Sequence, residues 1–568
     1  MPLKAHRLLT ATLAGLVLAA GATELPAVAA PAHDRTSAVE AHRVDQVPTP
    51  KLDWYSCYDY AECATVRLPL DYDQPHGATT EIAVLRVKAK DQQHKIGSLF
   101  LNPGGPGGSG TQFALAAPYF LSDSLLQRFD IVGIDPRGIG ASDNVKCFAS
   151  VKDQTAVLTK LNVAFPVGTA EEKTYVQGSK QLGAACSTTG RPLAGAMSTA
   201  EDARDMDVIR RAVGDPKLNY LGFSYGTALG QYYADMFPDR FRALVVDGVI
   251  DPRAWVGNTQ QILDARMHSA NGAYRALHEI LVRCGQAGPA YCAFAGGDPV
   301  QKFDLITQKL LQNPLVITDE SGTYTITYAA FVGGVLSTLY SPSAGDDVTS
   351  LIEQIWVALN GGSTSALGAR ITAAKASKAY DFPYDNSVEA TLGVVCTDTL
   401  EPADASSWPA AVAQRDQQAP YFGRAWGWLP SPCARKTWTV RDEDAYPGPF
   451  NKNTASPMLY VGSLWDPATN YDSAVAASGL HPTARLLSSN NWGHTAYGTG
   501  ACATAAIDNY LLTTALPAKG TLCTDALQPF STPLPTGGAT AKIRPASSGK
   551  QLPPVATPRP KSILTPDN

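Results

Sequence analysis

Residues 218–226 read LNYLGFSYG and combine an apolar run with a glycine-flanked serine. The first six residues have the length and apolar character of a buried strand. The last five fit the pattern G-x-S-x-G, and the pattern of Thr227–Met236 predicts a helix directly after them. In a strand–turn–helix unit of this kind, glycines at both flanks leave room for a strained turn that lifts the Ser224 hydroxyl above the sheet. We interpret Ser224 as a candidate nucleophile, with a purely structural turn as the alternative.

Other short apolar runs predict further strands on both sides of this unit. They are Ile82–Val87, Gly97–Leu101, Phe129–Ile134, Ala243–Val246, Met458–Val461 and Ala484–Leu487. Helical patterns such as Thr199–Val213 lie between several of them. Alternating strands and helices predict an α/β fold with a mostly parallel central sheet and helices on both of its faces.

The long gap between Asp251 and Pro457 has no clear series of strand-like runs. It carries helical patterns instead, including Thr259–Arg283 and Asp347–Leu359. A sheet that is interrupted and later resumed predicts an inserted domain, which we expect to be a mainly helical lid. The predicted division is a signal peptide (1–30), a leader or propeptide (31–50), a first core segment (51–252), the inserted lid (253–440), a second core segment (441–527) and a tail (528–568).

Both ends of the chain differ from its body. Residues 1–30 are typical of a secretory signal, with a basic start, the apolar stretch Leu8–Ala20 and a small-residue cleavage site at Ala27–Ala29. The apolar stretch is too short for a membrane anchor, so we predict a secreted, extracellular protein. Residues 31–50 are polar and irregular. Residues 528–568 are rich in proline and almost free of aromatic residues, which predicts a disordered tail.

The cysteines support an oxidising compartment. Their number, ten, is even, and no C-x-x-C pair occurs, so we expect disulfides rather than a zinc site. Connectivity does not follow from the sequence, and sequential pairing is the simplest hypothesis. It gives Cys57–Cys63, Cys147–Cys186, Cys284–Cys292, Cys396–Cys433 and Cys502–Cys523.

The composition excludes several classes of protein. Of 568 residues 45% are hydrophobic, which is enough for a packed core and excludes a mostly disordered chain. The net charge of −5 provides no basic field for nucleic acid. The body of the chain has no apolar run long enough to span a membrane. We further expect a monomer that needs neither a metal nor an organic cofactor.

A serine hydroxyl needs a general base to become a nucleophile. In folds built around a G-x-S-x-G turn, the serine is followed along the chain first by an acid and then by a histidine. Four histidines follow Ser224: His268 and His278 in helical patterns of the lid, His481 in a proline-flanked loop, and His494. Because His494 comes just past the last predicted strand, we predict that it is the base.

The acid should follow an earlier strand of the same sheet. Asp466 comes after the strand-like run PMLYVGSLW, at the sheet edge where catalytic residues collect in α/β folds. Asp247 and Asp251, which follow the preceding strand, are the alternatives. The nearby Thr469 hydroxyl could orient the loop of Asp466 or of His494, or make only a local turn contact.

Residues 102–110 read NPGGPGGSG, and Gly105–Gly110 fit the dinucleotide-binding pattern G-x-G-x-x-G. We reject that reading because the stretch lies deep in the chain, Pro106 is unusual in such a turn, and the Ser, Asp and His residues give the glycines another use. Acyl transfer needs backbone N–H groups that bind the developing oxyanion. One would come from Tyr225, the residue after Ser224, and the other from this loop.

Several segments resemble a known family. Residues 103–110 (PGGPGGSG) are similar to the HGGPG loop of prolyl-aminopeptidase-like serine peptidases, with Pro103 where many relatives have His. The other resembling segments are DPRGIGAS (135–142), Trp54 with Cys57, Cys63 and VRLPLDY (66–72), GSLWDPATN (462–470) and NNWGHTAYG (490–498). Over roughly residues 50–525 the chain resembles secreted actinomycete tripeptidyl aminopeptidases of the α/β-hydrolase fold.

The resemblance implies roles for particular residues. It makes Ser224, Asp466 and His494 the catalytic triad and Gly105 and Tyr225 the donors of the oxyanion hole. It also implies a cis peptide before Pro106 and the release of tripeptides from peptides with a free N-terminus. Such specificity needs a buried carboxylate for the substrate ammonium, because an unpaired buried charge is costly.

For that carboxylate, Asp398 in the segment CTD (396–398) is the candidate, against an ordinary structural aspartate. An esterase or amidase that acts on small non-peptide substrates would use the same triad and is the main alternative. A non-catalytic binding protein on the same scaffold is a third hypothesis. Epoxide hydrolases and haloalkane dehalogenases place Asp where this chain has Ser224, so they are excluded.

Overall fold

The computed structural model describes residues 33–319, 322–376 and 384–534, which belong to a compact unit that begins at His33. The predicted signal peptide, residues 1–30, and residues 535–568 of the predicted tail lie outside the described residues. Within the described part, no helix is long and apolar enough to cross a membrane.

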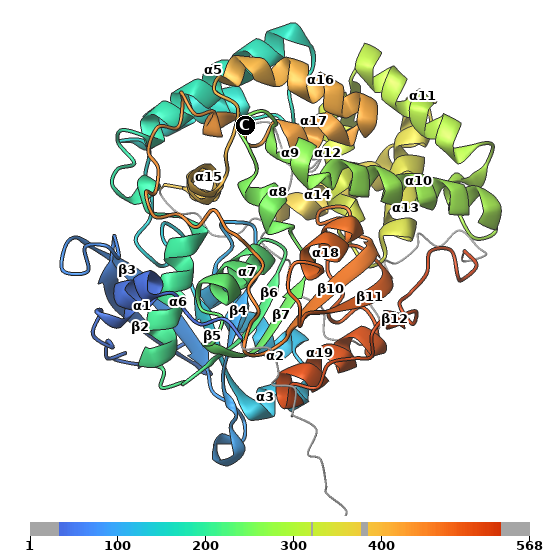
Figure 1. The fold of residues 1–568 in the computed structure, drawn as a ribbon. Helices are drawn as coiled ribbons and strands as arrows, with labels where there is room; N and C mark the ends of the chain where they lie inside the picture. Colours follow the sequence, from blue (N-terminus) through green and yellow to red (C-terminus); the bar gives the residue numbers. More distant parts are fainter. Residues whose placement is uncertain (1–32, 320–321, 377–383, 535–568) are drawn as a thin grey trace, which may run out of the picture. The chain divides into compact units, whose positions relative to one another are not determined.

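A ten-stranded sheet is the centre of this unit (Figure 1). In spatial order its strands are β1 (Tyr55–Cys57), β2 (Ala61–Pro69), β3 (Thr79–Val87), β5 (Phe129–Ile134), β4 (Gly97–Asn102), β6 (Leu218–Phe223), β7 (Phe241–Asp247), β10 (Met458–Trp465), β11 (Arg485–Trp492) and β12 (Leu522–Cys523). The pairs from β5 to β12 are parallel, and β1, β2 and β3 add an antiparallel edge. The predicted α/β fold with a mostly parallel sheet is therefore confirmed.

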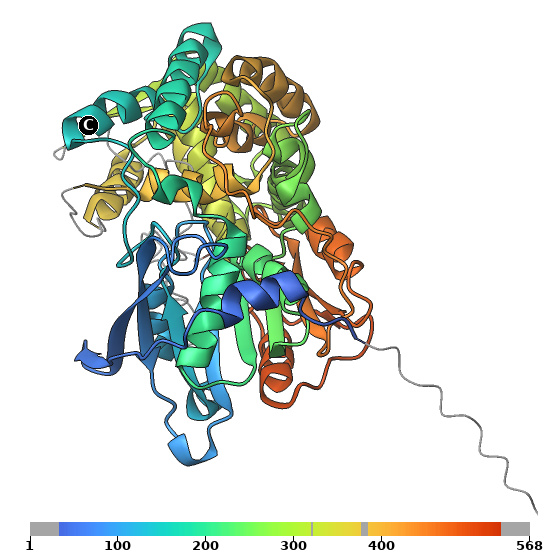
Figure 2. The same ribbon diagram turned by 60° about the vertical axis from the view of Figure 1, so that its left-hand side comes forward.

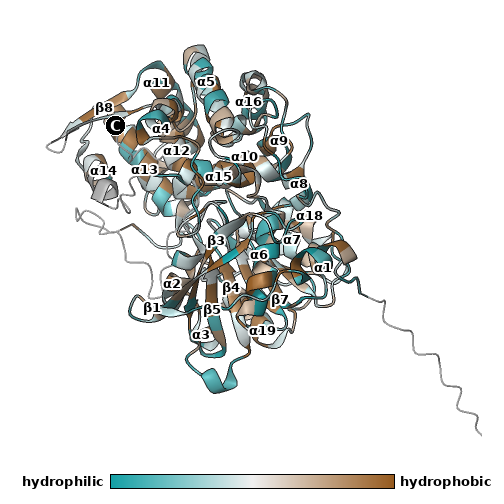
Figure 3. Cartoon of the chain, turned by 90° about the vertical axis from the view of Figure 1, so that its left-hand side faces the viewer, coloured by the Kyte–Doolittle hydropathy of each residue, from teal (hydrophilic) through white to brown (hydrophobic). Residues whose placement is uncertain are grey.

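Side chains of the central strands alternate between two separate cores. Leu99, Ile131 and Leu221 pack into one cluster, while their neighbours Phe100 and Val132 pack into the other. Because both faces are covered, the central strands are mostly apolar, and several of them have hydrophobic colouring in Figure 3. The helices of the core are α1 (Ala38–Asp45), α2 (Gly110–Phe120), α3 (Asp123–Arg128), α6 (Thr199–Ala212), α7 (Gly226–Met236), α18 (Tyr471–Ser478) and α19 (Ala501–Thr513).

The chain between β7 and β10 forms a mainly helical layer with its own core (Figure 2). Its helices are α8 (Pro252–Val256), α9 (Leu263–Met267), α10 (Ser269–Ala287), α11 (Pro299–Gln312), α12 (Tyr328–Leu339), α13 (Ala344–Leu359), α14 (Ser365–Ala376), α15 (Ser387–Asp398), α16 (Trp408–Gln418) and α17 (Phe422–Gly427). It also contains a hairpin, β8 (Leu315–Asp319) and β9 (Gly322–Ile326).

A second insertion, which the sequence reading missed, joins this helical layer. It contains α4 (Val151–Leu158) and α5 (Gly168–Cys186), between β5 and β6. Phe165 and Tyr175 belong to the core of the helical layer, and the Tyr175 ring lies 5.2 Å from the ring of Trp428. The helical layer is therefore built from two separate segments of the chain.

Two expectations about local structure are wrong. Residues 31–50 are not irregular throughout, because α1 forms there, is capped by Ser37 and buries Val44 in the sheet core. The pattern Thr259–Arg283 is not one helix, because His268 adopts the left-handed conformation at φ 55° and separates α9 from α10. An apolar periodicity does not reveal a break of a single residue.

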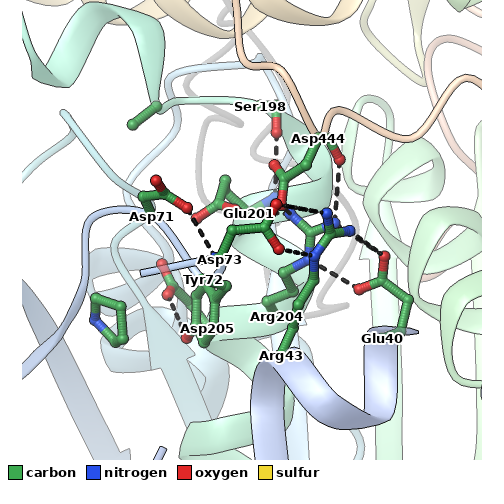
Figure 4. Close-up of polar contacts among 12 residues, drawn as sticks. Glu40, Arg43, Asp71, Tyr72, Asp73, Ser198, Glu201, Arg204, Asp205 and Asp444 are labelled. Atoms are coloured by element: carbon green, nitrogen blue, oxygen red, sulfur yellow. Dashed lines mark hydrogen bonds and ion pairs between the residues drawn. The ribbon is translucent and has the colours of Figure 1, made fainter. Parts of the chain in front are cut away.

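A buried network of ion pairs holds α1 against α6 and the chain that returns from the helical layer (Figure 4). Arg204 binds Glu40 at 2.9 Å and Asp444 at 2.8 Å, and Arg137 lies 2.5 Å from Glu201. Glu201, Asp442 and Asp444 form the one group of three carboxylates in the described residues whose oxygens could share a metal ion. Because the guanidiniums of Arg43, Arg137 and Arg204 already bind this group, we assign it a structural role.

The ten cysteines pair in sequence, as the simplest hypothesis predicts. The disulfides are Cys57–Cys63, Cys147–Cys186, Cys284–Cys292, Cys396–Cys433 and Cys502–Cys523. The fourth links α15 to the segment after α17, so it closes the base of the helical layer.

Candidate active site

The turn between β6 and α7 holds Ser224 in the conformation that its flanking glycines predict. Ser224 has φ 56°, and a Cβ on Gly222 would approach the Gly226 oxygen to 2.4 Å. The turn is fixed from two sides: the Ser224 N–H donates to the Asp247 oxygen at 3.0 Å, and Thr227 Oγ1 donates to the Ser224 oxygen at 2.6 Å. The side chain of Ser224 is therefore presented at the end of β6 on a rigid backbone.

Asp466 and His494 are brought together by the ends of β10 and β11. His494 Nδ1 lies 2.9 Å and 3.0 Å from the two carboxylate oxygens of Asp466, which is fully buried. The same carboxylate accepts the N–H groups of Ala468, Thr469 and Thr495. Because the carboxylate oxygens act as acceptors in these contacts, the imidazole directs its Nδ1–H toward Asp466.

The Thr469 hydroxyl contacts both of these side chains. Its Oγ1 donates to Asp466 Oδ2 at 3.0 Å and lies 3.4 Å from His494 Nδ1. This placement agrees with the expected orienting contact, and the local turn contact of Thr469 N–H to Asp466 is present as well.

Asp247 and Gly248 connect the serine turn with the histidine loop. The Asp247 carbonyl accepts Ser224 N–H, and its carboxylate accepts the N–H groups of Ala496 and Tyr497 at 2.8 to 3.0 Å. A Cβ on Gly248 would lie 3.2 Å from His494 Cε1, so this residue lies close beside the imidazole. His494 Nε2 is buried and has no hydrogen-bond partner among the residues that the structure describes. The Nε2 atom of His494 is thus available to accept a proton close to the turn that holds Ser224.

Residues of the helical layer hold the histidine loop from the other side. The His494 N–H donates to the Tyr340 oxygen at 3.1 Å, and the two rings are 5.2 Å apart. Trp465 and Trp492, each just before a loop of the site, stack with their ring centroids 4.7 Å apart, and the Arg283 guanidinium covers both. The sequence reading missed these supports, although a Trp close before each candidate residue was a visible signal.

Residues 103–108 lie directly against the serine turn. A Cβ on Gly104 would be 2.8 Å from both Ser224 Cβ and the Tyr225 nitrogen, so only glycine fits there. The Gly104 N–H donates to Asn102 Oδ1, and the Gly105–Pro106 peptide is cis, as the resemblance implies. The peptide that carries the Gly105 N–H therefore lies beside the backbone of Tyr225.

The carboxylate of Asp398 already accepts hydrogen bonds from other residues of the protein. It is the last residue of α15, and its oxygens accept the Thr199 N–H, the Thr199 hydroxyl and the Trp255 Nε1–H. Burial raises its pKa to about 6, while these donors favour the ionised form. Its expected role as the ligand of a substrate ammonium stays a prediction.

The histidine in the proline-flanked loop belongs to a second Asp–His pair. His481 is buried, with its Nε2 2.9 Å from Asp235 Oδ2 and its Nδ1 2.8 Å from the Tyr460 hydroxyl. Because both ring nitrogens are occupied, His481 has none left for a serine. The assignment of His494 as the base stays a prediction.

The buried Asp247 should impose a pH dependence on stability. Burial raises the pKa of its carboxyl to about 7. Between about pH 4 and about pH 7 the native state therefore keeps a proton on Asp247 that the unfolded chain has lost. The contribution of Asp247 to the free energy of unfolding falls as the pH rises through this range. We expect Asp247→Asn to remove this slope, which is at most about 1.4 kcal/mol per pH unit.

Denaturant unfolding at about pH 5 and about pH 8, with the disulfides intact, measures this difference. Asp472→Asn serves as the control, because that side chain is 81% exposed. The expectation fails if Asp247→Asn has the same pH dependence as the wild-type protein.

Two family models match the chain. One, described as alpha/beta hydrolase fold, covers residues 97–284, and the other, described as TAP-like protein, covers residues 419–523. The first range includes Ser224 and the glycine loop, and the second includes Asp466 and His494. Together the two models cover the segments of Ser224, Asp466, His494 and the glycine loop, and residues 285–418 of the helical layer lie between them.

Curated relatives match most of the chain. Carboxylesterase B of Mycobacterium tuberculosis is 31% identical over 518 residues, which cover 88% of this chain and 95% of the relative. Serine protease Hip1 of the same organism is 30% identical over 479 residues, covering 82% and 87%. Tripeptidyl aminopeptidase of Streptomyces coelicolor is 28% identical over 498 residues, covering 85% and 87%. These relatives confirm the resemblance that the motifs indicate.

Proposed function

Because this chain belongs to the α/β-hydrolase family that includes the tripeptidyl aminopeptidases, we propose that it is a secreted serine peptidase that releases tripeptides from free N-termini. The observation that supports a serine mechanism best is the imidazole of His494. Its Nδ1 lies 2.9 Å from Asp466 Oδ2, and its Nε2, which has no hydrogen-bond partner in the described part of the chain, is buried beside the segment that fixes Ser224.

In the proposed reaction Ser224 Oγ attacks the scissile carbonyl carbon while His494 Nε2 takes its proton. The imidazolium, stabilised by Asp466, then protonates the leaving amine, and an acyl-enzyme forms. Water, activated by the same nitrogen, adds to the acyl carbon, and collapse of that adduct returns the proton to Ser224. No metal or organic cofactor takes part in these steps.

The N–H groups of Gly105 and Tyr225 are the proposed donors to the oxyanion. Gly104 lies against Ser224 and Tyr225, so the peptide bond that follows it can direct its N–H to the same point. Removal of one such donor costs on the order of 3 kcal/mol of barrier.

Secretion is a further element of the proposal. The first 30 residues have the pattern of a signal peptide, and the five disulfides fit an oxidising compartment. A mass measurement of the protein from the culture medium of a producing cell tests both points. The proposal predicts a mature chain that lacks the leader and has no free thiol.

The substrate class is the remaining element, and a relative named carboxylesterase favours a second candidate function, an esterase. We expect kcat/KM for a free tripeptide p-nitroanilide to exceed that of its N-acetyl form by about 100-fold, because a closed site that binds an ammonium rejects the blocked end. Free dipeptide and tetrapeptide anilides test the length limit, and a p-nitrophenyl ester provides the reference. Equal rates with free and acetylated peptides would favour the esterase.

A further inference from the structure

Helix α15 of the helical layer contacts the glycine loop of the proposed oxyanion hole directly and is linked to Tyr225 through Thr199. Near its start, Thr391 binds the glycine loop, and at its end, Asp398 binds the network that holds Tyr225. All residues from Glu389 to Asp398 are buried, so the helix lies between the catalytic core and the rest of the layer. We propose that Thr391 and Asp398 are positioning residues that align the two N–H donors of the oxyanion hole.

The contact of Thr391 is direct and tightly packed. Its Oγ1 donates to the Pro106 oxygen at 3.0 Å. A Cβ on Gly107 would be 2.8 Å from the same Oγ1, so the loop lies on the helix without an intervening side chain. Because Pro106 follows Gly105 directly, this hydrogen bond restrains the peptide segment that carries the proposed donor.

The contact of Asp398 acts through a chain of hydroxyl groups. Asp398 accepts from the Thr199 hydroxyl, and Thr199 Oγ1 lies 2.6 Å from the Tyr225 hydroxyl. A threonine hydroxyl has one proton, so when it donates to the carboxylate it must accept from Tyr225. The chain therefore runs from Tyr225 through Thr199 to Asp398 and fixes the direction of each O–H.

Trp255 closes this network on its other side. Its Nε1–H donates to Asp398 at 2.8 Å, and its ring lies 5.6 Å from the Tyr225 ring. The Tyr225 side chain is thus held by a hydrogen bond at its tip and by a ring at its side, and it is 1% exposed. Because this side chain and the proposed N–H donor belong to the same residue, a shift of the side chain also shifts the N–H group.

This inference rests on the proposed serine-hydrolase function, and it assigns Asp398 a positioning role in place of direct binding to the substrate ammonium. A displacement of about 1 Å at a reacting group can reduce the rate by about 100-fold. The expected signature is a fall in kcat with KM nearly unchanged, because the oxyanion hole acts mainly on the transition state.

The first test compares two identical substitutions on one helix. Thr391→Val removes the hydroxyl that binds Pro106, whereas Thr397→Val removes a hydroxyl that donates only within α15, to the Gly393 and Val394 oxygens. Both threonines are 5% exposed. We expect Thr391→Val to lower kcat by about 10- to 100-fold, Thr391→Ser to restore it, and Thr397→Val to behave as the wild-type protein. Equal kcat values for the two valine variants would overturn the proposal.

The second test separates positioning from ammonium binding. We expect Asp398→Asn to lower kcat for the free peptide, the N-acetyl peptide and the ester alike, by about 10-fold or more. A rise in KM for the free peptide alone would instead make Asp398 the ammonium ligand and overturn its positioning role. If this variant does not fold, Trp255→Phe removes one donor to Asp398 while keeping an aromatic ring, and the same kcat pattern is expected.

The rate of fluorophosphonate labelling of Ser224 keeps this inference distinct from the proposed function. Phosphonylation also places negative charge in the oxyanion hole, whatever the natural substrate is. Slower labelling of Thr391→Val than of Thr397→Val supports the positioning role, and equal labelling contradicts it. A wild-type protein that is labelled but cleaves no free peptide contradicts the tripeptidyl specificity alone.

Discussion

Ser224→Ala is expected to lower kcat by about 10⁶-fold and to leave the fold intact. The substitution removes one oxygen atom, while the backbone hydrogen bonds of Ser224 to Asp247 and Thr227 remain. The strained φ of 56° is imposed by the turn and not by the hydroxyl, so alanine meets the same constraint. Hydrolysis of the free tripeptide anilide and fluorophosphonate labelling measure the loss, and thermal unfolding checks the fold.

Ser463→Ala is a matched control for this experiment. Ser463 is also a buried serine near the end of a central strand, and its Oγ has no hydrogen-bond partner within the described ranges of the chain. It should keep wild-type turnover and labelling. If Ser224→Ala retains turnover of peptide and ester, the serine mechanism is wrong, and a different nucleophile must be sought.

The site residues that we propose from the sequence have local signatures. Ser224 lies between two glycines after an apolar run, and both Asp466 and His494 follow an apolar run that forms a strand. In a parallel sheet, strand ends meet at one edge, so these separate signals could be combined without a structure. The structure brings Asp466 and His494 into hydrogen-bond contact and ties the loop of His494 to the turn of Ser224.

The residues that were not predictable act through contacts between distant segments. Thr391 binds Pro106 across 285 positions of the chain, and no local pattern distinguishes it from other threonines in a buried helix. Asp398 was visible as an acid, but its three donors from Thr199 and Trp255 depend on how α15 meets the core. The α5 segment was missed for the same reason, because its buried residues divide between two cores: Tyr175 packs in the core of the helical layer, and Leu182 packs in the core that lies on the sheet.

Asp466→Asn is expected to lower kcat by about 10⁴-fold, the second largest effect among these predictions. In the native site Asp466 Oδ2 faces three groups: the Thr495 N–H, the Thr469 hydroxyl and His494 Nδ1. An amide oriented to keep Oδ1 on the N–H groups of Ala468 and Thr469 would direct its NH₂ group at Nδ1. His494 would then carry its proton on Nε2 and could not accept the proton of Ser224.

Asp251→Asn is the appropriate control, because Asp251 was an alternative for the acid and follows a neighbouring strand. Its carboxylate caps α8 and binds Arg253, contacts that lie outside the Asp466–His494 pair. We expect this variant to keep kcat within about twofold of the wild-type value, because asparagine also caps helices well. If Asp251→Asn loses activity and Asp466→Asn keeps full activity, the catalytic acid is Asp251, which follows β7, and not Asp466. Loss of activity in Asp466→Asn alone would assign the role of the acid to Asp466, because the Asp251 carboxylate then contributes nothing to the orientation of His494.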